Sequence, residues 1–481
     1  MKKKKVLLLT ALITYCYLFY EQSAGINFLL FDIVLLLSML VIDRSLIKSS
    51  SWVVVSLGAL VSACGIVLYG NALSVFGNVF SLLLLTHLGM KQGCSLVFAF
   101  LQVGYSYITM SYAAVEKRFF SSETSGEAKA PEGMLGNMLR IAVPVVIGLV
   151  FLVVYRLASP VFNEFINNLS FDFLSWKFIW FTIVGFVLLA GYFYPRSWQA
   201  LLQTDKQAAD VLPGQLNEKE FSIFNDAGKE YSAGTLLFCL LNGLLLLVNL
   251  LDINFILRGG KLPDGMNHSE YVHQGVNSSI FSMLMAILVT LYFFRGNLNF
   301  IAKNKLIKAL ALIWIFQNAA LAGTCIYKNW IYIYDCGLTY KRIEVYVYLL
   351  LVFVGLCTTW IKITALKSNW YLLRRNTWAI YVVLIVSTLF HWDRIIISYN
   401  ATHASGVERS YYLYTMSETA LPLLLADFER GEEEVYYSGY YRRTLQDKTD
   451  EFLKAHRENG WQSWNLEDER TYRLIKQIKK H

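Results

Sequence analysis

Long apolar runs separated by short polar connectors fill most of the first 391 residues. A helix needs about 20 mostly apolar residues to cross the hydrocarbon core of a bilayer. The pattern predicts an all-α fold, a polytopic bundle of about eleven to thirteen transmembrane helices. The windows that meet or nearly meet the required length are 6–20, 26–42, 51–69, 72–89, 94–115, 138–158, 176–194, 231–251, 276–294, 306–326, 343–361 and 377–391.

A second pattern begins at residue 392, where long apolar runs give way to amphipathic segments such as DKTDEFLKAHREN and EDERTYRLIKQIKKH. Apolar residues at helical spacing, with cations near the end of the last segment, predict a small helical region over 392–481, called here the tail domain. Ahead of it we expect an N-terminal transmembrane block (1–115), a polar loop (116–136) and a main transmembrane domain (137–391). The segment 159–174 within that domain is too polar to span and predicts an interfacial helix.

If every candidate span crosses the membrane, the loops rich in Lys and Arg fall on both sides of it, although such loops are normally cytoplasmic. Lys2 to Lys5, Arg44 and Lys48 favour a cytoplasmic N-terminus, whereas the cation-rich loops at 195–230, 295–305 and 362–375 would then lie outside. If one of the three segments between residues 51 and 115 does not cross fully, both groups become cytoplasmic. The run 72–89, which contains Asn78, is the weakest of the three, and the tail domain is then predicted to be extracytoplasmic.

Composition supports a membrane protein and excludes several other classes. Of 481 residues 56% are hydrophobic and only 16% are charged, and the net charge of +8 fits a basic excess in short loops rather than nucleic-acid binding. Seven cysteines without a CxxC pair predict neither a disulfide framework nor a metal site. The basic start and apolar run of MKKKKVLLLTALITYCYLFY are also compatible with a signal peptide, but we interpret them as a retained first span.

Motifs of the common enzyme classes are missing from the sequence. It has no GxxxxGK[ST], GxSxG or HExxH, so ATPase, serine hydrolase and zinc protease activities are not indicated, and no cofactor is predicted. Ionisable residues inside apolar runs are the next candidates, because charges are costly at membrane depth. Asp32 and Asp252 lie in or at the end of spans, and Glu270 and His273 share one helical face in HSEYVHQG. The pair could ligate a metal, but a polar first helical turn explains it more simply.

The connector YIYDCGLTYKR (332–342) has a structural explanation of its own. Gly337 permits a turn, and Thr339 can cap the following helix. Asp335 can pair with Arg342 or Lys341, and Tyr334 fits an interfacial belt of aromatic residues.

The order of several motifs resembles a large uncharacterised bacterial membrane family catalogued as domain of unknown function 4173, which is related to 4153. The motifs are RLASPVF (156–162), NLLDINFILRGG (249–260), the connector with Tyr334, Gly337, Leu338, Thr339 and Arg342, and WDRIIISYN (392–400) with Asp393 and Asn400. The resemblance covers most of residues 5–425 and implies an architecture and these residues as functional candidates, without a reaction. His273 and Gln274 stand where the family usually has arginines.

These observations lead to three hypotheses about function. The first is a non-enzymatic scaffold or sensor in a bacterial inner membrane, with the lipid bilayer and another envelope protein as partners and no nucleic acid. The second is a transporter or channel with Asp32 in a polar cavity. The third is a membrane enzyme acting on lipid or glycan, in which Asp252, Glu270, His273, Asp335 and Arg342 would converge.

Overall fold

The structure is a computed structural model that describes residues 2–89, 94–119, 147–148, 150–159, 162, 175–212, 227–258, 268–301, 304–403, 409–429 and 439–480. The predicted polar loop at 116–136 and the predicted interfacial helix at 159–174 lie almost entirely outside these residues. Both therefore stay predictions.

Helices make up all of the regular structure in the described residues, apart from an isolated bridge between Val211 and Lys367. The predicted all-α fold class is confirmed. The helices are α1 (Lys2–Phe19), α2 (Ile26–Ile42), η1 (Arg44–Lys48), α3 (Ser50–Tyr69), α4 (Ala72–Leu88), α5 (Leu96–Phe119), α8 (Trp176–Phe193), α9 (Gln199–Gln207), α10 (Ala227–Leu257), α11 (His268–Phe293), η3 (Asn297–Asn299), α12 (Lys305–Cys336), α13 (Tyr340–Thr364), α14 (Asn369–Ser387), α15 (Trp392–His403), α16 (Arg409–Thr415), η4 (Glu418–Ala420), α17 (Leu421–Glu429), α18 (Gly439–Glu458), η5 (Trp461–Ser463) and α19 (Leu466–Ile478).

Six of these helices are long and apolar enough to cross a membrane, and the bent pair α14 and α15 adds a seventh if it is counted as one span. The six are Ser50–Tyr69, Trp176–Phe193, Gly228–Leu257, Gly275–Phe293, Lys305–Cys336 and Tyr340–Thr364. Three shorter apolar helices are Ile26–Ile42, Ala72–Leu88 and Leu96–Thr109. The polytopic helical architecture is confirmed, whereas the total of eleven to thirteen spans stays a prediction.

The chain forms two compact units, each assembled from separate stretches of sequence. Unit 1 contains residues 1–20 and 104–196, and α1 packs against α8 within it. The ring of Tyr15 stacks on Phe181 at 4.5 Å, and Tyr20 Oη lies 2.8 Å from Ser175 Oγ. A Cβ on Gly185 would come within 2.3 Å of the Tyr15 ring, so this close approach requires glycine.

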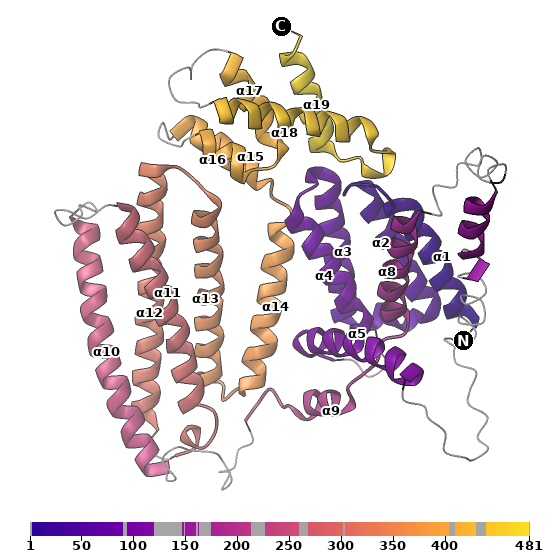
Figure 1. The fold of residues 1–481 in the computed structure, drawn as a ribbon. Coiled ribbons are helices and arrows are strands. Elements are labelled where there is room, and N and C mark those ends of the chain that lie inside the picture. The colour runs from indigo at the N-terminus through magenta and orange to yellow at the C-terminus, as the bar shows by residue number, and fades with distance from the viewer. Residues whose placement is uncertain are drawn as a thin grey trace, which may run out of the picture. The chain divides into compact units, whose positions relative to one another are not determined.

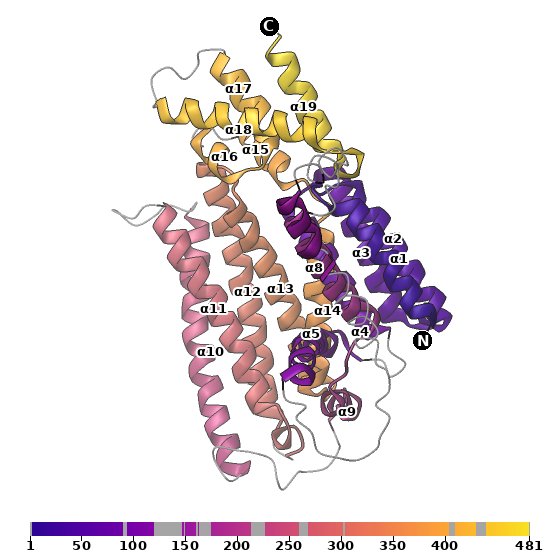
Figure 2. The same cartoon turned by 45° about the vertical axis from the view of Figure 1, so that its right-hand side comes forward.

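Unit 2 contains residues 21–103 and 197–481, and one of its hydrophobic cores joins α10, α11, α12 and α13, which run side by side in Figures 1 and 2. Phe238, Trp314 and Leu349 are buried in this core, and Phe238 packs edge-on against Trp314 at 5.4 Å. The outer surface of α10 is apolar, with Leu236, Leu244 and Leu251 each about 60% exposed. Such a surface is stable in lipid and not in water.

The run 72–89, which the sequence marks as the weakest of the three candidate spans, forms the short apolar helix α4. Helix α4 packs antiparallel to α3, and Asn78 of α4 donates a hydrogen bond to the Ala59 carbonyl of α3 at 3.0 Å. Both Ala72–Leu88 and Leu96–Thr109 are shorter than the six span-length helices, so the segment that does not cross fully stays a prediction.

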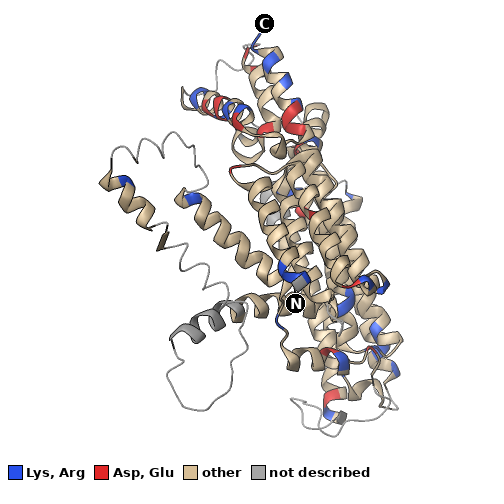
Figure 3. Ribbon diagram, turned by 90° about the vertical axis from the view of Figure 1, so that its right-hand side faces the viewer, with Lys and Arg blue, Asp and Glu red and all other residues tan. Residues whose placement is uncertain are grey.

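The two ends of unit 2 differ in composition. The tail domain lies where α2 and α13 begin and α3 ends, since Ile26 N donates to Trp464 O, Gly70 contacts Asn465, and Tyr340 N donates to Tyr411 Oη. The connectors at the opposite end carry Lys and Arg, at 44–48, 295–305 and 362–375. Figure 3 shows this cationic end and the mixed charges of the tail domain.

The tail domain has a hydrophobic core that includes Tyr412, Leu424, Leu445 and Ile475, all at most 2% exposed. Ile333 of α12 and Leu338 of the following connector belong to the same core. Helices α15 to α19 form it above one end of the bundle (Figures 1 and 2). The predicted helical character of 392–481 is confirmed within the described residues.

Candidate functional site

The connector at 337–342 and the helix after Trp392 meet in the structure. Gly337 ends α12 with φ of +79°, a conformation that other residues rarely adopt. Asn400, which is 3% exposed, accepts a hydrogen bond from Leu338 N at 2.6 Å and donates one to Leu338 O at 2.9 Å. One amide side chain therefore satisfies both backbone groups of a buried turn, and it joins α15 to the connector.

Arg342 stabilises the same turn from the other side. Its guanidinium donates to the carbonyls of Cys336 and Gly337, and it lies 3.9 Å above the Tyr332 ring. The interaction with the C-terminal carbonyls of α12 is favourable because these carry the negative end of the helix dipole. Two motifs that are far apart in the sequence thus form one structural unit.

The other candidates in the connector have different surroundings. Thr339 occupies the N-cap position of α13, as predicted, but its side chain makes no capping hydrogen bond. Tyr334 is 64% exposed, as expected for a residue facing an interface, and Asp335 is also exposed. The predicted pairing of Asp335 with Arg342 stays a prediction.

Asp252 forms a buried ion pair between α10 and α12. Its Oδ1 lies 2.7 Å from Lys328 Nζ, and its Oδ2 accepts a hydrogen bond from Thr324 at 2.9 Å. Both charged residues are less than 10% exposed. A buried carboxylate is tolerated when a cation and further hydrogen bonds satisfy it, and both conditions hold here.

A row of polar side chains continues from this ion pair along the same two helices. Gln317 donates to Asn242 Oδ1 at 2.8 Å, Asn249 donates to Gln317 O at 3.1 Å, and Asn242 donates to Leu310 O at 3.0 Å. Hydrogen bonds of this kind hold helices together in lipid, where hydrophobic burial between helices contributes little. We call these residues, with Asp252, Thr324 and Lys328, the polar ladder.

Asp32 lies in a different seam and has a different partner. It is completely buried, and its Oδ2 accepts a hydrogen bond from Asn78 at 2.7 Å. Asn78 is also completely buried and belongs to α4. Among the described residues, no ion pair to Asp32 is found, and Asp32 Oδ1 has no hydrogen-bond partner. The amide of Asn78 alone compensates this carboxyl group.

Glu270 and His273 both lie on α11, but their side chains fall outside the described residues. Their role stays a prediction.

Asp393 begins α15 and is 6% exposed. Its Oδ2 accepts hydrogen bonds from the backbone N–H and the hydroxyl of Ser417, whereas Oδ1 has no partner among the described residues. Burial raises the pKa of this carboxyl group; the Ser417 hydrogen bonds lower it in part, and the charges of Glu418 and Glu467 raise it again. Within the described part of the chain, the ionised form of Asp393 is therefore stabilised only by the two hydrogen bonds from Ser417.

Asp393 lines a crevice of about 800 Å³ at the end of the bundle that carries the tail domain. The crevice has an apolar part between α13 and α14 and a polar mouth formed by the α3–α4 turn and the start of the tail domain. Its apolar lining includes Ile343, Val347, Leu351, Ile380, Val383 and Leu384, and its polar lining includes Asn71, Glu344, His391, Asp393, Ser417 and Glu418.

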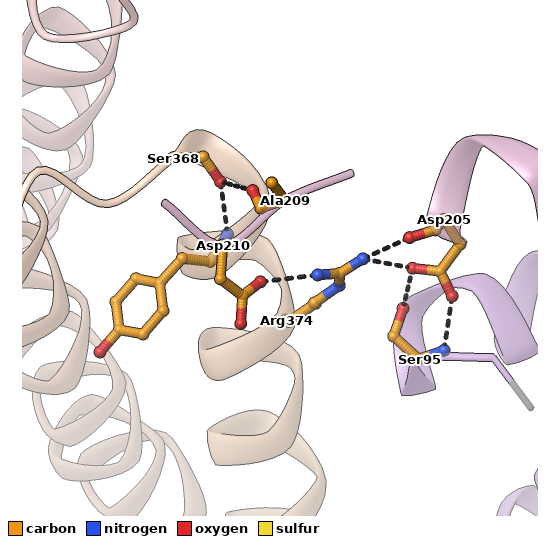
Figure 4. Close-up of polar contacts among 7 residues, drawn as sticks. Ser95, Asp205, Ala209, Asp210, Ser368 and Arg374 are labelled. Atoms are coloured by element: carbon orange, nitrogen blue, oxygen red, sulfur yellow. Dashed lines mark hydrogen bonds and ion pairs between the residues drawn. The ribbon is translucent and has the colours of Figure 1, made fainter. Parts of the chain in front are cut away.

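A cluster around Arg374 lies at the other end of unit 2 and was not predicted. Figure 4 shows Arg374 between Asp210 Oδ1, at 2.6 Å, and Asp205 Oδ1, at 2.8 Å. Asp205 also accepts hydrogen bonds from the backbone N–H of Ser95 at 2.7 Å and from its hydroxyl at 2.9 Å. The cluster joins the starts of α5 and α14 to the end of α9. Its sequence signal was weak, because the acids and the arginine lie in separate polar connectors.

These features define the class of the protein as a polytopic α-helical membrane protein, with lipid-facing apolar surfaces and buried polar pairs between helices. The chain belongs to the family described as "Domain of unknown function (DUF4153)", whose model matches residues 7–426. The resemblance therefore holds at the level of an uncharacterised family, and the matching model is that of the related 4153 rather than 4173. No curated protein and no solved structure matches the chain.

Proposed function

We propose that this protein is a non-enzymatic component of a bacterial inner membrane, and that its tail domain is an extracytoplasmic module that binds another envelope protein. The observation that carries this proposal is the way the tail domain is bound to the start of unit 2. Ile26 N donates to Trp464 O at 3.0 Å, and Gln22 Oε1 accepts from Gly460 N and Ser463 Oγ, both at 2.9 Å.

Close packing reinforces these hydrogen bonds. A Cβ on Gly25 would come within 2.4 Å of the Ser463 backbone, so the two segments touch where a side chain cannot fit. A domain held in this way transmits a force or a binding event to the bundle, as a scaffold or sensor requires. A flexibly tethered domain would not do so.

Charge supports the proposed sidedness. The connectors at the end of unit 2 opposite the tail domain carry Lys and Arg at 44–48, 295–305 and 362–375. Cytoplasmic loops are enriched in these residues, so the opposite end, with the tail domain, is extracytoplasmic.

The binding surface that we propose is a polar pocket of about 520 Å³ beside α18. Trp461 and Trp464 line it and are 54% and 43% exposed, and Glu451 and Glu469 add negative charge. Exposed tryptophans are frequent at the centre of protein interfaces.

Two experiments test this proposal. Alkaline phosphatase fused after His481 should be active and a fluorescent protein fused there should be dark; the opposite result would place the tail domain in the cytoplasm. A photo-crosslinking amino acid at Trp461 should yield a discrete adduct with one envelope protein, and the same substitution at Tyr440, which is 71% exposed outside the pocket, should not. Equal adducts at both positions would argue against a specific surface.

The transporter hypothesis has less support. Asp32 Oδ2 accepts from Asn78, and Gln317 donates to Asn242 of α10, so each of these side chains takes part in helix packing through one polar atom. The enzyme hypothesis also has less support. Asp252 is hydrogen-bonded to Lys328 and Thr324, and Arg342 donates to backbone carbonyls, so both side chains have structural partners.

A further inference from the structure

The crevice beneath the tail domain has the form of a site for an amphiphile. Ile343, Val347 and Leu351 recur every four residues on one face of α13, and this face lines the crevice. At 1.5 Å per residue, their span corresponds to roughly 12 Å of apolar wall. Ile380, Val383 and Leu384 of α14 form the facing wall. A hydrocarbon chain fits such a wall, whereas a polar solute would lose its hydration there.

The mouth of the crevice is negatively charged. Glu344, Asp393 and Glu418 line it, and none of its lining residues is a lysine or an arginine. His391 is the remaining titratable group of the mouth with a basic side chain, and its Nε2 lies 3.5 Å from Glu467 behind it. The mouth therefore holds three carboxyl groups for which the lining offers no strong cation.

Asp393 provides an independent indication of a missing partner. Its side chain is almost completely buried, and its Oδ1 has no hydrogen-bond donor among the described residues. A buried acceptor without a donor destabilises the fold, and more so when it is charged. An ammonium group in the mouth could donate to this oxygen and supply the missing positive charge.

We propose that the crevice binds a membrane phospholipid with a primary-amine headgroup, with one acyl chain between α13 and α14 and the ammonium group among Asp393, Glu344 and Glu418. The phosphate of this lipid also needs donors. Asn71, whose Oδ1 already accepts from Ser74 N, has its amide N–H groups left for this role, and Tyr348 adds a hydroxyl. The site is independent of the partner proposed for the tail domain.

The test is native mass spectrometry of the full-length protein in detergent, with equimolar phosphatidylethanolamine, phosphatidylcholine and phosphatidylglycerol added. Phosphatidylcholine keeps the positive charge but has no N–H donor, and phosphatidylglycerol has no cation. Phosphatidylethanolamine should be retained preferentially, by about fivefold to tenfold over each of the others, because charge-assisted hydrogen bonds are the stronger class. Equal retention of the three lipids would overturn the proposal.

Variants identify the site. Glu344 and Glu418 are exposed, so the double variant Glu344→Gln/Glu418→Gln should fold normally and lose most of the preference for the amine lipid. Val383→Trp, which fills the apolar part, should lower the retention of all three lipids. Asp447→Asn is the matched control, since this acid lies on the exposed surface of α18 and its side chain is 73% exposed. Unchanged preference in the double variant, or an equal loss in the control, would show that the lipid binds elsewhere.

Discussion

Asp252 and Asp32 are both buried acids between helices of unit 2, but different kinds of group stabilise them. Asp252 has Lys328 at 2.7 Å and the hydroxyl of Thr324 at 2.9 Å. Asp32 has the amide of Asn78 at 2.7 Å and no described cation. The first pair is stable only as two charges together, and the second arrangement needs a donor and no counter-charge. The difference predicts how much stability is lost when the partner of each acid, Lys328 or Asn78, is replaced.

Removing Lys328 should have the largest effect. Lys328→Met leaves the Asp252 carboxylate buried without its cation, and breaking a buried pair from one side typically costs about 3–5 kcal/mol. Unfolding of the detergent-solubilised protein, followed through its 12 tryptophans, should show this loss. The double variant Asp252→Asn/Lys328→Met should recover much of it. Equal destabilisation in the single and double variants would contradict the role of the charge.

Removing Asn78 should have a smaller effect of the same kind. Asn78→Leu leaves Asp32 without its donor and frees the Ala59 carbonyl, and an unsatisfied buried polar group costs roughly 1–3 kcal/mol. Asp32→Asn should be milder than Asp252→Asn, because Asp32 has no described cation to leave unpaired. The same unfolding assay compares the three variants. A larger loss of stability in Asp32→Asn than in Asp252→Asn would show that Asp32 has a charged partner.

Breaking the polar ladder at Gln317 should cost less again. Gln317→Leu removes one hydrogen bond between α10 and α12, and such bonds average about 0.6 kcal/mol in membrane proteins. Disulfide crosslinking between cysteines placed on the two helices should remain efficient in this variant. Loss of crosslinking would mean that Gln317 holds α10 in place by itself.

Two acids at the tail domain, Glu467 and Asp393, differ in the same way and make a prediction about pH. Burial alone would raise the pKa of Glu467, but His391, whose Nε2 lies 3.5 Å away, and the charge of Arg394 lower it overall. A carboxyl group with a lowered folded pKa stabilises the fold above its unfolded pKa, about 4.3, and this contribution is lost as pH falls through the folded value. Glu467→Gln should therefore weaken the acid destabilisation of the tail domain, by roughly 0.5 kcal/mol for a single pair.

Asp393 has a pKa shift in the opposite direction to that of Glu467. Its pKa is raised, so the folded state gains relative stability as pH falls through the raised value towards the ordinary one. Circular dichroism of Glu467→Gln and Asp393→Asn across acidic pH should show shifts of opposite sign. Shifts of the same sign would mean that the two acids do not differ in their access to a cation.

The helices of this protein were predictable because the signal for each is local. About 20 apolar residues suffice to define a span, and 306–326 and 343–361 both fall within observed helices. The pairing of polar residues inside the bundle has no such local signal: Asn78 counts as polar in a local window, but its partner Asp32 lies 46 residues away.

The pairings at the candidate sites were harder to predict. Asp252 is recognisable from its depth in an apolar run, whereas Lys328, 76 residues away, is not recognisable as its partner. The family resemblance named Gly337, Arg342 and Asn400, but only the fold brings Asn400 to Leu338. The crevice draws residues from several helices, so no single stretch of sequence could indicate it.

The bonds between Gln22, Ile26 and the segment 460–464 also concern the order in which the chain is made. Domains form as synthesis proceeds from the N-terminus, so the first residues of unit 2 enter the membrane long before their partners leave the ribosome. Gln22 and the Ile26 amide must wait, hydrated at the membrane surface, until all of the intervening helices are inserted. Closure of this contact therefore requires that synthesis has passed Trp464, and a product that stops before Gly460 would leave these groups without these hydrogen-bond partners.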